Sequence, residues 1–159
     1  MSEDLSELLA SLTRTRIDFL VIGAHAVAFH GRQRATEDVD VWVGRRRENV
    51  RRLREVLREF GADIGEEGER RFAELDRQMV RLGHPPAMID ILNFAGGVTF
   101  EEAWARRQSG VLMGVEVPFP SRDDLIATKR AAGRPQDLAD LARLERAARR
   151  QGDEGSGST

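Results

Sequence analysis

The segment 37–43, Glu-Asp-Val-Asp-Val-Trp-Val, constrains the fold most, because polar and apolar side chains alternate strictly from Asp38 to Val41. A period of two is typical of a β-strand, in which successive side chains leave opposite faces. The three valines would share one face, and Asp38 and Asp40 would share the other. The pattern therefore predicts a strand with an apolar face toward a core and two carboxylates aimed together at the opposite side.

Helix-like and strand-like stretches alternate along the rest of the chain. Apolar residues at helical spacing predict a first helix that begins at Ser2 and carries Leu5, Leu8, Leu9 and Leu12, and a second helix over 48–60. Short apolar runs predict strands over 17–22, 78–82 and 88–92. Further helices are expected over 24–30, 99–107, 121–133 and 135–150, with a small hairpin over 111–117 and a mobile glycine-rich loop over 61–71. This order predicts an α/β (α+β) fold, in which helices flank a mixed β-sheet.

Length and composition narrow the class of protein. The 159 residues suit one domain, which we place at 1–150, and the polar tail at 151–159 is predicted to be disordered. A formal net charge of -2 provides no general attraction to nucleic acid, and the lack of cysteine excludes thiolate metal sites and cysteine nucleophiles. No segment resembles a signal peptide or membrane span, so we expect a cytoplasmic protein.

Two further features could join the Asp38–Asp40 pair in one site. Asp90 lies in the apolar run Met-Ile-Asp-Ile-Leu, where a carboxylate needs a counter-ion or a metal. Gly23 joins a predicted buried strand to a short helix, and the first amides of a helix bind phosphate. Three oxygen ligands would favour Mg²⁺ or Mn²⁺. The alternatives are two acids on a solvated strand face, a salt bridge from Asp90 to arginine, and an ordinary turn at Gly23.

Four segments together resemble the minimal nucleotidyltransferases of the polymerase-β superfamily, most closely the AbiEii-like group of toxin and antitoxin nucleotidyltransferases. They are Gly23-Ala24-His25, the run Arg34-Ala-Thr36-Glu-Asp38-Val-Asp40, the Ile-Asp-Ile around Asp90, and the segment from Lys129 through Asp137 to Asp140. The resemblance covers about residues 17–145. It implies a polymerase-β palm-like fold with C-terminal helices and transfer of a nucleoside monophosphate from an NTP to an acceptor.

The resemblance also implies a role for each matching residue. Gly23 and Ala24 would bind the triphosphate through backbone amides, with His25, Arg34, Thr36, Lys129 and Asp137 also at the nucleotide. Asp38, Asp40 and Asp90 would be the catalytic and metal-binding carboxylates for Mg²⁺ or Mn²⁺. Ala24 departs from the serine that many members of the superfamily carry after the glycine. Asp137 is expected to cap the last helix and to orient Lys129.

Lys129 is the only lysine among the 25 lysine and arginine residues of the chain. A compact charge on a flexible stem could reach a phosphate there, and the alternative is an ordinary lysine on a helix surface. A second basic feature is an arginine stripe on the predicted helix 47–58. It could bind an RNA acceptor, although such a stripe is more typical of a solvated helix face.

The sequence leaves two classes of function to compare. The first is a Mg²⁺-dependent nucleotidyltransferase whose acceptor is RNA or protein, within a toxin–antitoxin system. The second is a regulatory or antitoxin-type binding protein that keeps a slow nucleotide site and acts through a cognate toxin or antitoxin partner. An enzyme predicts that Asp38, Asp40 and Asp90 come together near Lys129, whereas a binding protein predicts an exposed apolar patch.

Overall fold

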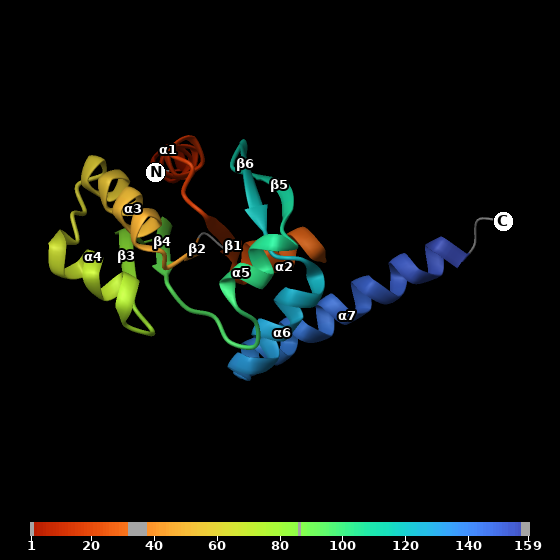
Figure 1. Ribbon diagram of the computed structural model, residues 1–159. Coiled ribbons are helices and arrows are strands. Elements are labelled where there is room, and N and C mark those ends of the chain that lie inside the picture. The colour runs from red at the N-terminus through yellow and green to blue at the C-terminus, as the bar shows by residue number, and fades with distance from the viewer. Residues whose placement is uncertain (1, 32–37, 86, 157–159) are drawn as a thin grey trace.

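The computed structural model describes residues 2–31, 38–85 and 87–156, which form a four-stranded mixed sheet, a two-stranded sheet and seven helices (Figure 1). The elements in chain order are α1 (Ser2–Arg14), β1 (Phe19–Ile22), α2 (Gly23–His30), β2 (Val39–Val43), α3 (Arg47–Glu59), α4 (Gly65–Glu74), β3 (Met79–His84), β4 (Ala87–Leu92), α5 (Phe100–Ala105), β5 (Gln108–Leu112), β6 (Val115–Phe119), α6 (Arg122–Ala132) and α7 (Pro135–Ser156). The predicted mixed α+β fold is confirmed.

The larger sheet has the strand order β1-β2-β4-β3. β2 pairs with β1 in antiparallel and with β4 in parallel orientation, and β3 and β4 form an antiparallel hairpin. β5 and β6 make a separate antiparallel ribbon. The parallel β2–β4 pair lies at the centre of the sheet, and its register decides which polar side chains meet there.

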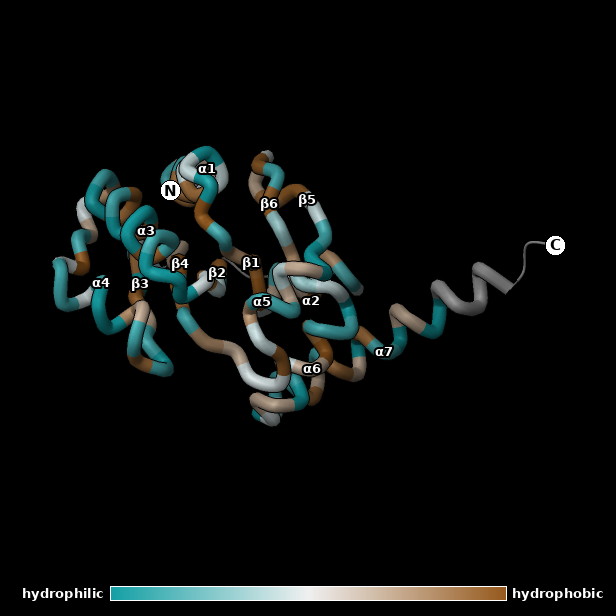
Figure 2. Tube along the Cα trace, viewed as in Figure 1, coloured by the Kyte–Doolittle hydropathy of each residue, from teal (hydrophilic) through white to brown (hydrophobic). Residues whose placement is uncertain are grey.

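One face of the sheet packs on the main core. The valines of β2 and the isoleucines of β4 meet the leucines of α1 and the apolar stripe of α3, all of them buried. The leucine spacing of α1 and the alternation of β2 predict this packing correctly. In Figure 2 the residues of the central strands are mostly brown, whereas the outer helices α3 and α4 are mostly teal. The main core therefore fixes which face each strand residue takes.

The opposite face of the sheet is covered over β1 and β2 by a smaller apolar cluster. Leu20, Trp42 and Ala103 are buried there, and Phe100 meets the ring of Trp42 edge to face at 5.3 Å between centroids. α5 supplies Phe100 and Ala103, and its N-terminus is held by a capping box of Thr99 and Glu102. The polar residues of β2 and β4 share this face.

Two segments differ from the predictions. Residues 65–74 form the helix α4 rather than a mobile loop. Its glycines are poor helix formers, but Phe72 is buried in the core, and Arg70 donates hydrogen bonds to Glu67 and Glu74 on neighbouring turns. α7 continues to Ser156, beyond the end that we expect near residue 150, and projects away from the body (Figure 1). None of the helices in the described ranges is both long and apolar enough to cross a membrane.

Candidate functional site

Two of the three predicted carboxylates lie side by side at the centre of the sheet. Asp40 of β2 is the register partner of Asp90 of β4. The flanking Val39, Val41, Ile89 and Ile91 are buried in the main core, so the two acids lie on the opposite face. Neighbouring strands are about 4.8 Å apart, which brings the two side chains within ligand distance of one ion.

The environment of Asp40 disfavours its ionised form. Burial is the largest cause, and the neighbouring charges of Asp90 and Asp38 add to it, raising the pKa of Asp40 from 3.8 to about 6. Lys129 and Arg134 act in the opposite direction. Asp40 therefore lies among two other acids and two cations, and the effects of burial and of the acids outweigh those of the cations.

Gly23 lies directly against Asp40. Its φ of 72° is in the left-handed region, and a Cβ at this position would overlap Oδ2 of Asp40. Gly23 begins α2, and the preceding Ile22 at the N-cap has no side-chain acceptor for the first amides of the helix. The predicted turn thus combines a close approach to a carboxylate with helix amides that are available to an anion.

His25 lies two residues further along α2. Its Nε2 is buried and has no hydrogen-bond partner among the residues that the structure describes. Burial lowers the pKa of His25, against smaller opposing effects of the backbone and carboxylate of Asp38. His25 is therefore close to Asp38, beside the predicted phosphate turn.

Asp90 forms a salt bridge with Arg81, a partner that the sequence alone does not identify. Arg81 of β3 donates from Nε to Oδ1 at 2.7 Å and from Nη2 to Oδ2 at 3.0 Å, and the two residues are register partners. Counting outward from the pair of His84 and Ala87 at the turn of the hairpin would place Arg81 opposite Asp90, and this is the signal that could have found the pair. The salt bridge considered for Asp90 from the sequence is therefore present.

The lysine at 129 is buried at the α6–α7 junction. Its Nζ lies 3.2 Å from Oδ1 of Asp137 and 3.0 Å from Oδ2 of Asp140, and both carboxylates are 1% exposed. Asp137 also accepts hydrogen bonds from the backbone N and Nε of Arg134. Burial raises the pKa of Asp137, but the hydrogen bonds from Arg134 and Lys129 outweigh it, and the net shift is downward.

Lys129 is therefore buried rather than on a helix surface, and Asp137 accepts hydrogen bonds from the backbone N of Arg134 before α7 and from Nζ of Lys129. Because Lys129 and Arg134 both act on Asp40, the helix junction is brought up to the carboxylates. The sequence analysis does not assign Arg134 a role. Its position just before Pro135, at the turn between two predicted helices, is the signal that could have found it.

The predicted three-carboxylate metal cluster is not assembled. Across residues 2–31, 38–85 and 87–156, no group of three or more His, Asp or Glu side chains could hold a metal ion. Asp38 is exposed and lies one residue before β2, and Asp90 is held by Arg81. Without a cation, the like charges of these carboxylates repel one another. The remaining candidates, Arg34 and Thr36, lie outside the described residues.

The arginine stripe of α3 is neutralised by acids. Each of its four arginines has an acidic partner within 4 Å, with pairs Arg47–Glu74, Arg51–Glu48, Arg54–Glu69 and Arg58–Asp63. This favours the solvated-face interpretation of the stripe over an RNA-binding one.

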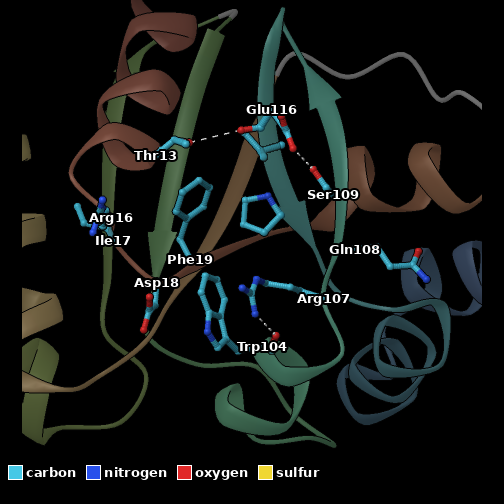
Figure 3. Close-up of a pocket in the computed structure, with 12 residues that line it drawn as sticks. Thr13, Arg16, Ile17, Asp18, Phe19, Trp104, Arg107, Gln108, Ser109 and Glu116 are labelled. Atoms are coloured by element: carbon cyan, nitrogen blue, oxygen red, sulfur yellow. Dashed lines mark hydrogen bonds between the residues drawn. The ribbon is translucent and has the colours of Figure 1, made fainter.

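A cleft of about 800 Å³ lies elsewhere, between α1, β1, α5 and the β5–β6 ribbon (Figure 3). Phe19, Trp104, Arg107 and Pro118 are among its lining residues, and the guanidinium of Arg107 stacks 3.9 Å from the centre of a Trp104 ring. None of the predicted site residues lines it. The carboxylates lie instead on the face of the sheet opposite the main core, outside this cleft.

Comparison with known proteins agrees with this geometry. The family described as "Nucleotidyltransferase of unknown function (DUF6036)" matches residues 1–147. A crystal structure of the lincosamide antibiotic adenylyltransferase LnuA with lincomycin bound has a similar fold, with a TM-score of 0.55 and 12% sequence identity over 91% of this chain and 96% of that chain. The search of curated proteins finds no match. The polymerase-β-like nucleotidyltransferase fold is thus confirmed, and the chain belongs to the DUF6036 family of nucleotidyltransferases.

Proposed function

We propose that this nucleotidyltransferase transfers a nucleoside monophosphate from an NTP to an acceptor hydroxyl on the Asp40–Asp90 face of the sheet, with the help of a divalent cation. The observation that carries the proposal is the register of β2 and β4, which sets the two carboxylates side by side next to Gly23 at the start of α2. A metal site and a phosphate site then share one short stretch of structure.

The donor set fits Mg²⁺ or Mn²⁺. Carboxylate oxygens are the ligands that these hard ions prefer, and a bound cation would oppose the effects of burial and neighbouring acids that raise the pKa of Asp40. Asp40 and Asp90 would hold the ion, with Asp38 joining from the end of β2. When bound, the cation would neutralise charge on the phosphates and favour in-line attack at the α-phosphorus.

The residues of the chain supply binding and orientation. Backbone amides of Gly23 and Ala24 would bind the triphosphate, and Lys129, held by Asp137 and Asp140, would add positive charge beside it. Asp90 would orient the acceptor hydroxyl, whose oxygen bonds to the α-phosphorus as the bond to pyrophosphate breaks and the hydroxyl proton is released. Catalysis would then come mainly from positioning and charge.

The acceptor is open to three classes. The structural neighbour is named as a lincosamide antibiotic adenylyltransferase, which adds small molecules to the RNA and protein acceptors expected from the sequence. Assignment to the AbiEii-like branch and a toxin–antitoxin role stay predictions. Among the residues whose burial the structure describes, the exposed large apolar side chains belong to different parts of the chain: Phe29, Leu75, Met79, Val111 and Leu138.

The test is transfer of label. Purified protein is incubated with each α-labelled NTP, Mg²⁺ or Mn²⁺, and separate pools of small hydroxyl compounds, RNA and protein. We expect label on one pool, and none with Asp40→Asn. As a control, Arg107→Gln alters the separate cleft and should leave transfer unchanged. NTP binding without transfer to any pool would favour the regulatory binding protein, and absence of NTP binding would contradict the proposal.

A further inference from the structure

Arg81 occupies the position of a cation among the candidate metal ligands. Its guanidinium bonds to both oxygens of Asp90, through Nε at 2.7 Å and Nη2 at 3.0 Å. Arg81 donates both hydrogen bonds, and Asp38 and Asp40 are close enough for their charges to act on its guanidinium. A positive group therefore already pairs with Asp90 beside the other candidate ligands.

The bidentate hydrogen bonding matters because it occupies both carboxylate oxygens of Asp90. A side-on pair engages both oxygens of Asp90, so a metal ion that takes an inward-facing oxygen must compete with a hydrogen bond that is already made. A guanidinium close to the ion would also repel it. Arg81 and a divalent cation thus stabilise the same acids and exclude each other in part.

We propose that Arg81 is a positioning residue that holds Asp90 until a divalent cation displaces it, and so sets the metal affinity of the site. This inference rests on the proposed function, since it assumes that Asp40 and Asp90 bind the ion. The side chain of Arg81 is 53% exposed, so it has room to swing toward solvent when it is released. Binding of the metal ion then requires the Arg81–Asp90 ion pair to break.

A second ion pair provides a matched control. Arg106 donates from Nε to Oδ2 of Asp124 at 2.9 Å and from Nη2 to Oδ1 at 2.8 Å. Arg106 is 52% exposed and Asp124 7%, close to the 53% and 13% of Arg81 and Asp90. Asp124 belongs to the first turn of α6 and is not among the candidate ligands. Loss of either arginine should therefore cost similar stability, but only one should change metal binding.

The experiment titrates Mg²⁺, without nucleotide, into the wild type, Arg81→Gln, Arg106→Gln and Asp40→Asn, and follows thermal stability. We expect Arg81→Gln to lower the apparent dissociation constant for Mg²⁺ roughly threefold to tenfold, the effect of losing one partly exposed ion pair. Arg106→Gln should leave this constant unchanged, and Asp40→Asn should weaken or abolish the response. Arg81→Lys keeps the positive charge but loses the bidentate hydrogen bonds, so its dissociation constant for Mg²⁺ should lie between those of wild type and Arg81→Gln. This variant replaces Arg81→Gln in the comparison if Arg81→Gln does not fold.

A direct readout is the Nε–H signal of Arg81 in ¹⁵N NMR, assigned by its loss in Arg81→Lys. Mg²⁺ should shift this signal and leave that of Arg106 in place. An unchanged or weaker Mg²⁺ affinity in Arg81→Gln, while Asp40→Asn loses its response, would overturn this inference alone. No Mg²⁺ response in the wild type or in Arg81→Gln would overturn both the inference and the metal site of the proposed function.

Discussion

Replacing Asp40 by asparagine should stabilise the metal-free protein, although it removes a residue that we assign to catalysis. Burial and neighbouring acids raise the pKa of Asp40 from 3.8 to about 6, so the folded state disfavours its ionised form at neutral pH. One pKa unit corresponds to about 1.4 kcal/mol, and the shift amounts to roughly 3 kcal/mol. Because water reaches part of this side chain, we expect a gain of roughly 1 to 3 kcal/mol near pH 8.

The sign of the pH dependence follows from linkage. Between the unfolded and folded pKa values the native protein binds more protons at Asp40, so this residue lowers stability as pH rises from 3.8 to about 6. The advantage of Asp40→Asn should therefore be full above about pH 7 and should vanish near pH 4.

Urea unfolding in the presence of a chelator, at several pH values, measures this difference. Asp76→Asn is the control, because Asp76 is 82% exposed and pairs only on the surface, with Nη1 of Arg45 at 2.6 Å from its Oδ1. It should change stability little and without this pH profile. Equal or lower stability of Asp40→Asn than wild type near pH 8 would refute the argument that burial and neighbouring acids disfavour the ionised form of Asp40.

Three further predictions concern other parts of the site and core. Gly23→Ala should lose nucleotide binding and more stability than Gly61→Ala, which has a similar φ of 78° but open space for a Cβ; differential scanning calorimetry and an NTP titration would compare them. Lys129→Met leaves the buried carboxylates of Asp137 and Asp140 without this cation, so it should lower the free energy of unfolding in urea by roughly 3 to 5 kcal/mol. Arg130→Met removes only a surface ion pair and should lower it by less than about 1 kcal/mol. Burial lowers the pKa of His30, so its neutral form stabilises the fold and stability should fall as pH drops below about 6.5; His30→Gln should reduce that slope in urea titrations.

Local patterns in the sequence predict most of the elements that carry the site. The alternation in β2 and the apolar setting of Asp90 place both acids correctly in strands, because periodicity reports which face is buried. The pairing of β2 with β4 cannot be read in this way, since it depends on the order of strands across the sheet. Proximity of Asp40 and Asp90 is therefore predicted only through the family resemblance.

The parts that sequence reasoning misses depend on longer-range geometry. Arg81 meets Asp90 only through the register of the β3–β4 hairpin, and Arg134 reaches Asp40 only because α6 and α7 fold back on each other. The helix α4 is missed because its glycines and charges are typical of loops, while ion pairs between turns and one buried phenylalanine stabilise it. In each case the stabilising contact is tertiary and has no local signature.

A crystal structure of the protein with Mg²⁺ and an NTP that cannot be cleaved at the α-phosphate tests the central claim most directly. We predict phosphate oxygens on the amides of Gly23 and Ala24, a metal ion bound by Asp40 and Asp90, and the guanidinium of Arg81 moved off Asp90. A nucleotide bound in the cleft beside Trp104, or a triphosphate remote from Asp40, would contradict the account.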